Sequence, residues 1–233
     1  TTKVLTVLLG IMMTEPEDIV TVSENAVNVP EDSSKIGLVA GEQLTMGELL
    51  RATMVGSGND GSIAIAEHIS GSEPAFVALM NEAAQRFGAV NTHFANSHGY
   101  NEDNHWSTAR DLAKIAKVAM ENETFREIAA MTTYTLPRTE WSAARRVSAQ
   151  NRAMMVDGED NEFYYPPMIG IKTGQHSMAG YCFVGGAEKD GVELISVVLK
   201  SGSRASRWND TRKLMEYGFS QYVSTSIERI YAE

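Results

Sequence analysis

Three short motifs in this sequence carry side chains that together could perform acyl transfer. Lys3 stands near the start of the chain, Ser57 and Asn59 are separated by one glycine, and Lys172 opens a Lys-Thr-Gly tripeptide. Such groups suit attack of a serine on a carbonyl carbon, because a serine hydroxyl is a weak nucleophile and needs a neighbouring base. A lysine can be that base only when its pKa is lowered, which burial and a nearby cation both promote. Lys172 could supply the second cation, and either lysine could be the base.

Each motif taken alone has an ordinary structural explanation. Ser57 suits a helix cap between two helical segments. Lys3 suits a solvated charge at a helix end, and Lys172 suits a strand lysine whose stem lies along apolar surface. The functional hypothesis therefore requires the three motifs to meet at one place, and the elements that carry them decide whether they can.

Helices are expected to position the first two motifs. Apolar residues recur at helical spacing from Val4 to Met12 and predict a core helix with Lys3 at its head. Thr45 and Glu48 form the pattern of a capping box at the start of the next helix. Further helices are expected over 44–56, 59–70, 72–88, 108–131 (as one or two helices) and 207–223, the last with an apolar face at Leu214, Met215, Tyr217 and Phe219.

Strands are expected to position the third motif. Residues 168–174 predict a short strand that ends in Lys-Thr-Gly, and 180–202 predict a hairpin that turns at Lys189-Asp190-Gly191. Residues 93–108 are polar and predict a loop. The remaining short runs predict small strands or extended segments: 19–29, 34–44, 133–138 and 145–154. The sum predicts an α+β fold in which a helical cluster packs on an antiparallel sheet.

Composition narrows the function classes. The 233 residues carry a formal net charge of −10, which disfavours nucleic acid because no basic stripe is present to contact phosphates. The chain is 43% hydrophobic, enough for a full core. Cys182 is the only cysteine and is expected to be a buried structural thiol. The five histidines show no metal-site spacing, so we expect no metal and no cofactor.

The three motifs in this order resemble the signature S-x-x-K, S-x-N and K-T-G of the low-molecular-mass penicillin-binding proteins, the serine D-alanyl-D-alanine carboxypeptidases. The resemblance covers nearly the whole chain and extends to several longer stretches: TTKVLTVLL, GSGNDGSIAIAEHISGS, FANSHGYNEDNHWSTARDLAKIA, IGIKTGQHSMAGYCFVGGAEKDGVELISVVL and KLMEYGF. It implies the β-lactamase/DD-peptidase-like fold. It also implies a catalytic domain over 1–222, with 223–233 as the possible start of a β-rich domain.

The resemblance places the nucleophile immediately before Thr1, because the serine of S-x-x-K comes three residues before the lysine. No other lysine in the sequence has a serine at that spacing. We expect the family's N-terminal strands, which would complete the sheet, to precede this serine. Three explanations stay open: a serine that carries a covalent adduct, a chain split or truncated at this point, or a serine supplied by another segment. The first and third are favoured, because loss of the strands should disrupt the fold.

The family's residue roles carry over by motif. The resemblance implies that Ser57 relays a proton to the departing amine and that Asn59 holds Lys3 and the substrate's peptide carbonyl. Lys172 and Thr173 would contact the terminal part of the substrate. Two further positions complete this expectation. At Gly174, a side chain would block an extended peptide on the strand edge. The backbone amide of Gln175, together with that of the serine, would bind the oxyanion.

Two arginines and a histidine are weaker candidates. Arg207 matches a family arginine at the start of the last helix and suits the free carboxylate of a substrate. Arg152 matches another family arginine near the cleft, and a surface arginine is the alternative explanation for it. His98 matches a position at the rim of the site, and we favour a purely structural role for it.

The leading hypothesis is an enzyme that removes the terminal D-alanine from peptidoglycan pentapeptides through an acyl-enzyme, and that β-lactams acylate. The first alternative is a serine β-lactamase, with Glu102 as the nearest candidate for activating the deacylating water. Its spacing does not support that role, and the motif S-G-N also points to the peptidases. The second alternative is a catalytically silent peptidoglycan-binding module. The resemblance further implies export to the bacterial cell envelope, and a membrane anchor outside this chain.

Overall fold

The computed structural model describes residues 1–230, with side chains as far as Tyr222. Its helices are α1 Lys3–Met13, α2 Glu24–Val27, α3 Met46–Gly56, α4 Asn59–Ser70, α5 Glu73–Arg86, α6 Ala109–Met120, α7 Glu123–Ala129, α8 Arg152–Met155 and α9 Arg204–Ile230. Its strands are β1 Ile19–Thr21, β2 Gln43–Thr45, β3 Thr133–Leu136, β4 Arg145–Ser148, β5 Met168–His176, β6 Gly180–Lys189 and β7 Val192–Ser201.

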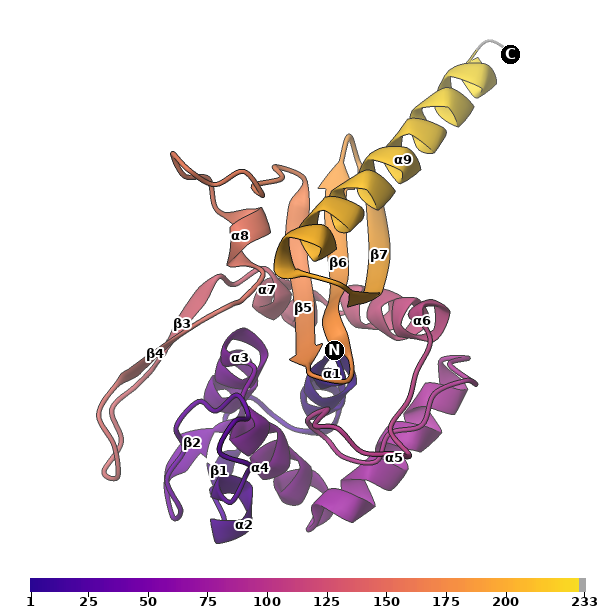
Figure 1. Ribbon diagram of the computed structural model, residues 1–233. Coiled ribbons are helices and arrows are strands. Elements are labelled where there is room, and N and C mark those ends of the chain that lie inside the picture. Colours follow the sequence, from indigo (N-terminus) through magenta and orange to yellow (C-terminus); the bar gives the residue numbers. More distant parts are fainter. Residues whose placement is uncertain (231–233) are drawn as a thin grey trace.

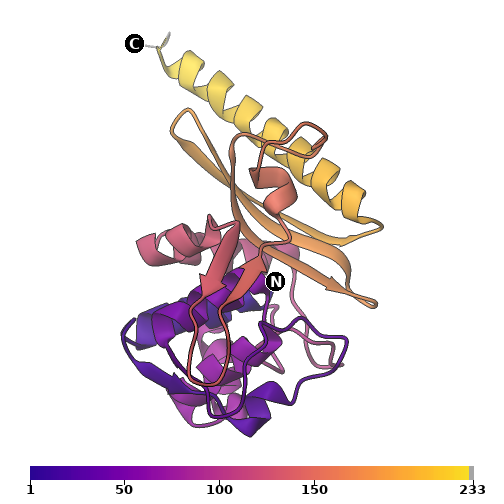
Figure 2. The same ribbon diagram turned by 90° about the vertical axis from the view of Figure 1, so that its left-hand side faces the viewer.

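The main sheet lies between one long helix and the helical cluster (Figure 1). Its three antiparallel strands follow the order β5-β6-β7, so β5 is an edge strand of the described sheet. Helix α9 packs on one face, whereas α1, α6 and α7 contact the other (Figure 2). Adjacent residues on β6 serve the two faces, since Phe183 packs toward α9 and Val184 packs into the helical core. The α+β fold predicted from the sequence is confirmed.

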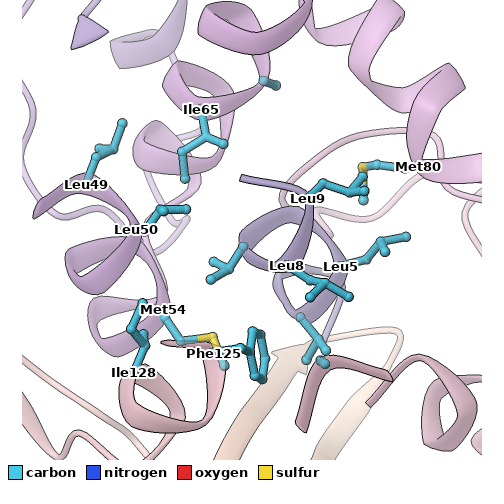
Figure 3. Packing of buried hydrophobic residues seen from close by; sticks show 14 of the residues in the cluster. Leu5, Leu8, Leu9, Leu49, Leu50, Met54, Ile65, Met80, Phe125 and Ile128 are labelled. Atoms are coloured by element: carbon cyan, nitrogen blue, oxygen red, sulfur yellow. The ribbon is translucent and has the colours of Figure 1, made fainter. Parts of the chain in front are cut away.

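Helix α1 runs through the middle of the helical cluster. Its buried leucines meet side chains from α3, α4, α5 and α7, including Leu50, Phe125 and Met80 (Figure 3). Packing is tight enough that a Cβ on Gly10 would come within 2.5 Å of the Leu50 side chain. Because the helix is buried on all sides from its first turn, Lys3 at its head is buried too.

Capping residues explain where several helices begin. Thr45 accepts a hydrogen bond from the backbone N–H of Glu48, and the Glu48 carboxylate accepts one from Thr45, which confirms the predicted capping box. Asn122 caps α7 and so divides 108–131 into two helices. The extended structure predicted over 19–29 is wrong at its end, because Ser23 accepts a hydrogen bond from the Ala26 N–H and starts the short helix α2.

The apolar face predicted for the last helix is half wrong. Met215 and Phe219 are buried, but Leu214 is 47% exposed and Tyr217 is 67% exposed. The buried face instead includes Trp208 near the start of the helix. Trp208 lies seven residues before Met215, and Phe219 lies four residues after it. Residues seven and four apart share one side of a helix, whereas 214 and 217 turn away from it.

Helix α9 continues through residues 223–230. A domain boundary at residue 222 and a β-rich domain beyond it stay predictions. Among the described residues, no helix has the length and hydropathy that a bilayer-spanning helix needs.

Candidate active site

The three predicted motifs line one pocket. The head of α1 and the end of β5, which contribute to it, lie close together in the fold (Figure 1). Helix α1 contributes the first motif, the junction of α3 and α4 the second, and β5 the third. The sequence-predicted residues that line this pocket are Lys3, Ser57, Asn59, Lys172, Thr173, Gly174 and Gln175. Residues up to 172 positions apart in the chain thus meet in one crevice, as the acyl-transfer hypothesis requires.

Lys3 is held by two acceptors. Its Nζ donates to Oδ1 of Asn59 at 2.6 Å and to the backbone oxygen of His98 at 2.7 Å. The side chain is only 4% exposed. Burial lowers the pKa of Lys3 well below its usual value, the charge of Lys172 lowers it further, and the Asp60 carboxylate opposes them. A lysine in this state can accept a proton from a neighbouring hydroxyl.

Lys172 is the second buried lysine of the pocket. Burial, with the charge of Arg207 as a further cause, lowers the pKa of Lys172 to about 8. Within the described part of the chain, neither Lys172 nor Lys3 forms an ion pair. Two buried, unpaired cations are costly to keep, and such perturbed groups concentrate at functional sites.

Ser57 occupies a strained turn between two helices. It ends α3 in the left-handed conformation, with φ 60° and ψ 33°, and Gly58 then caps α4. Such a conformation costs a serine roughly 1 kcal/mol or more and is common where strain serves a site. Because no side-chain cap bond is present at this helix start, the cap explanation for Ser57 does not apply to α4.

Asp60 fixes the surroundings of this turn. Its buried carboxylate accepts hydrogen bonds from the backbone N–H groups of Ile36, Gly37, Leu38 and Gly61 at 2.9–3.1 Å. The bonds from Ile36, Gly37 and Leu38 tie the loop before α3 to the head of α4. They thereby hold Asn59, the residue before Asp60, against Lys3. No short sequence motif marks Asp60 as a site residue.

The edge strand β5 brings the third motif to the pocket through an irregular backbone. Ile171 has a φ of 98°, which is strained for a β-branched residue, and the register with β6 shifts between Met168 and Gly170. At Gly174, a Cβ would lie 2.9 Å from the backbone nitrogen of Thr1. Only a glycine lets the head of α1 approach the strand this closely.

Other predicted residues lie elsewhere. Arg207 is buried but is not among the lining residues; its guanidinium donates to the backbone oxygen of Cys182 at 3.3 Å and lies 4.0 Å from the centroid of the Trp208 ring. Arg152 is exposed on α8, and Glu102 is exposed on the 93–108 loop; neither lines the pocket. Their proposed roles stay predictions.

His98 lines the pocket with its ring engaged locally. Its Nδ1 accepts a hydrogen bond from the backbone N–H of Tyr100 at 3.1 Å, and its backbone oxygen binds Lys3. Burial, with the charge of Lys3 next in importance, lowers the pKa of His98 to about 3. The ring is therefore neutral at physiological pH, and these contacts agree with a structural role.

The pocket also contains residues that the sequence analysis did not select. Thr173 Oγ1 donates to Oε1 of Gln150 at 3.3 Å. Asp32, Tyr100 and His176 form its rim. No short motif marks these side chains, because loops and turns far apart in the sequence bring them together. Within the described residues, no three His, Cys, Asp or Glu side chains are placed to hold a metal ion.

The fold matches those of solved DD-peptidases. The Streptomyces K15 DD-transpeptidase superposes with a TM-score of 0.83 and 30% identity, over 94% of this chain and 86% of that one. The D-alanyl-D-alanine carboxypeptidase of Mycobacterium tuberculosis H37Rv gives a TM-score of 0.82 and 26% identity, over 94% and 80% of the two chains. Fold and motif geometry thus define a protein of the penicillin-binding, DD-peptidase class.

Sequence comparison identifies the family. Residues 1–203 match the D-alanyl-D-alanine carboxypeptidase family, and the chain belongs to it. D-alanyl-D-alanine carboxypeptidase DacF of Bacillus subtilis is 33% identical over 226 residues, which cover 95% of this chain and 55% of DacF. DacA of Haemophilus influenzae is 35% identical, over 88% of this chain and 50% of DacA. The chain spans about half the length of these two curated relatives.

Proposed function

We propose that the protein is a serine D-alanyl-D-alanine carboxypeptidase that removes the terminal D-alanine from peptidoglycan pentapeptide stems. The observation that carries this proposal is the contact between Lys3 and Asn59, made inside a pocket that Ser57 and Lys172 also line. Family membership supports the same activity. Residues 1–222 would form its catalytic domain.

The reaction follows from what these side chains can do. The hydroxyl of the serine before Thr1 attacks the carbonyl carbon of the penultimate D-alanine while its proton passes to a neutral lysine, Lys3 or Lys172. The peptide C–N bond then breaks, and the departing amine takes a proton relayed through Ser57. Water hydrolyses the resulting ester and releases the shortened stem with the serine restored.

The strand edge supports the mode of substrate binding. The free edge of β5 offers backbone groups to an extended peptide, as in strand addition, and Thr173 and Gly174 lie on the part of it that lines the pocket. The backbone N–H of Gln175, together with that of the serine, would hold the oxyanion; the loss of one such donor typically costs about 10²–10³ in rate. Arg207 and Arg152 remain proposed partners of the substrate carboxylate.

The substrate implies the location of the protein. Stem peptides ending in D-Ala-D-Ala belong to the cell wall, so we place the protein in the bacterial envelope, at the outer face of the cytoplasmic membrane or in the periplasm. A part outside this chain would anchor it to the membrane. The family match and its curated bacterial relatives support this placement.

Acylation by a penicillin tests the proposal. The full-length protein is incubated with benzylpenicillin, and its intact mass is followed with time; a second assay measures D-alanine released from a peptide that ends in D-Ala-D-Ala. We expect a covalent adduct that persists, together with release of D-alanine. No adduct would contradict the proposal, and rapid turnover of the penicillin would favour a β-lactamase.

A further inference from the structure

The pocket beside the motif residues is narrow. Its cavity volume is about 100 Å³, whereas pockets that enclose drug-sized ligands measure roughly 300–1,000 Å³. One water molecule takes about 30 Å³ of the liquid, so the cavity accommodates a few waters. The space beside the motif side chains is therefore narrow.

Most walls of the pocket are firmly held. Lys3 belongs to the buried first turn of α1, and β5 is paired with β6 along its length. The loop that carries Tyr100 is closed by one side chain: Asn96 Oδ1 accepts from the backbone N–H of Gly99 at 2.6 Å, and Asn96 Nδ2 donates to the backbone oxygen of Tyr100 at 2.9 Å. Tyr100 is thus presented from a rigid loop.

Residues 30–33 form the exception. The neighbouring backbone at 36–38 is pinned by Asp60, but 30–33 are exposed or half-buried. Over the described part of the chain, a single hydrogen bond joins 30–33 to another segment: the Tyr100 hydroxyl donates to Oδ1 of Asp32 at 3.0 Å. We call this bond the latch. The next lining residue, Ser34, is held separately, because its backbone oxygen accepts a hydrogen bond from the Asn59 N–H at 2.8 Å. Breaking the latch therefore frees residues 30–33 alone.

The latch lies beside the route of the substrate. The Tyr100 ring meets the His176 ring edge to face, with centroids 5.2 Å apart, and His176 is the last residue of β5. Tyr100 therefore spans the rim of the pocket from 30–33 to the edge strand along which an extended peptide would lie. In an extended peptide on that edge, a group attached beside the reacting carbonyl would lie near this side chain.

We propose that Tyr100 is a specificity-determining residue. Its hydroxyl, latched to Asp32, keeps the rim narrow, so slim linear acyl donors enter more readily than donors that are branched or bulky beside the reacting carbonyl. The inference rests on the proposed function and deepens it, because it names the shape of donor that the same pocket accepts.

Two penicillins that differ in bulk test the latch. Second-order acylation rates of the full-length protein are measured with benzylpenicillin and with nafcillin, whose aromatic side chain is bulkier next to the amide. Tyr100→Phe removes the hydroxyl and keeps the ring. We expect it to raise the nafcillin-to-benzylpenicillin rate ratio about fivefold or more, because a hydrogen bond to a carboxylate no longer holds the rim closed.

Two further variants separate the latch from general effects. Asp32→Ala breaks the same bond from its other end, so it should raise the ratio similarly. Tyr217→Phe, at an exposed tyrosine of α9, should leave the ratio at its wild-type value. An unchanged ratio in both Tyr100→Phe and Asp32→Ala overturns the inference. Acylation of the wild-type protein by benzylpenicillin tests the proposed function, so the two hypotheses fail separately.

Discussion

Two places in this protein bury charge, and they do so in opposite ways. Glu42 lies under the β3–β4 hairpin with a fully buried side chain and forms an ion pair with Arg145 at 2.9 Å. Its carboxylate also accepts hydrogen bonds from Thr139 and Ser142. Lys3 and Lys172 are buried as deeply in the pocket, yet each lacks an ion pair within the described residues.

The electrostatic consequences differ in the same way. Burial by itself would raise the pKa of Glu42, but the bonds from Ser142, Arg145 and Thr139 outweigh it and lower that pKa. At the two lysines, burial lowers the pKa with too little opposing negative charge. A compensated buried charge keeps its ordinary ionisation and fixes a hairpin. An uncompensated one becomes a base that can exchange protons, which is what acyl transfer needs.

The largest effect is expected at Lys3. Lys3→Arg keeps the positive charge but removes the ability to give up a proton near neutral pH. Acylation of the full-length protein by benzylpenicillin should slow by about 10²–10⁴, measured as a second-order rate. Lys117→Arg, at a lysine whose side chain is 76% exposed, is the matched control and should not change the rate. A near-normal rate for Lys3→Arg would remove Lys3 from the proton transfer.

The next largest effect is expected at the compensated pair. Arg145→Met leaves the Glu42 carboxylate buried without its cation, which typically costs about 3–5 kcal/mol of stability, measured by urea unfolding. Replacing both partners, as Glu42→Gln with Arg145→Met, should recover much of that loss, since no charge is left unpaired. A loss below about 1 kcal/mol in the single variant would show that the pair behaves as a surface ion pair.

Removal of the Lys172 charge should stabilise the fold, whereas removal of the Arg145 charge should destabilise it. Its pKa falls from 10.5 to about 8 on folding, so the unfolded chain binds more protons between these values. The free energy of unfolding of the wild type therefore rises as pH increases from 8 to 10.5. Below pH 8, the folded protein bears the full cost of burying the protonated lysine. Lys172→Met should abolish acylation but stabilise the fold by about 1–3 kcal/mol at neutral pH.

Urea unfolding of Lys172→Met and the wild type at two pH values checks this assignment. The stability gap measured near pH 7 should shrink strongly once the pH reaches 10.5, where the unfolded lysine also loses its proton. An equal gap at both pH values would assign the effect to side-chain packing. Lys189→Met, at the exposed last residue of β6, is the control.

The sequence predicts features that depend on neighbouring residues, and it misses those that depend on residues far apart in the chain. Thr45 with Glu48 and the turn at Lys189-Asp190-Gly191 are local signals, and the structure bears out both. The motif residues were found because their types and order are distinctive. Asp60 was missed, since its role depends on backbone groups 22–24 residues away. Glu42 and Arg145 are 103 residues apart, and no local pattern pairs them.

The smallest effect is expected where an ion pair is exposed. Arg126 on α7 bridges Glu188 on β6, at 2.6 Å, and Glu193 on β7. Its side chain is 32% exposed, and Glu188 is 49% exposed, so water and salt already screen these charges. Arg126→Ala should cost about 0.5 kcal/mol, and less at high salt. If its urea midpoint instead fell as far as that of Arg145→Met, exposure would not distinguish the ion pairs of Arg126 from that of Arg145. The contrast between compensated and uncompensated buried charge would then need another cause.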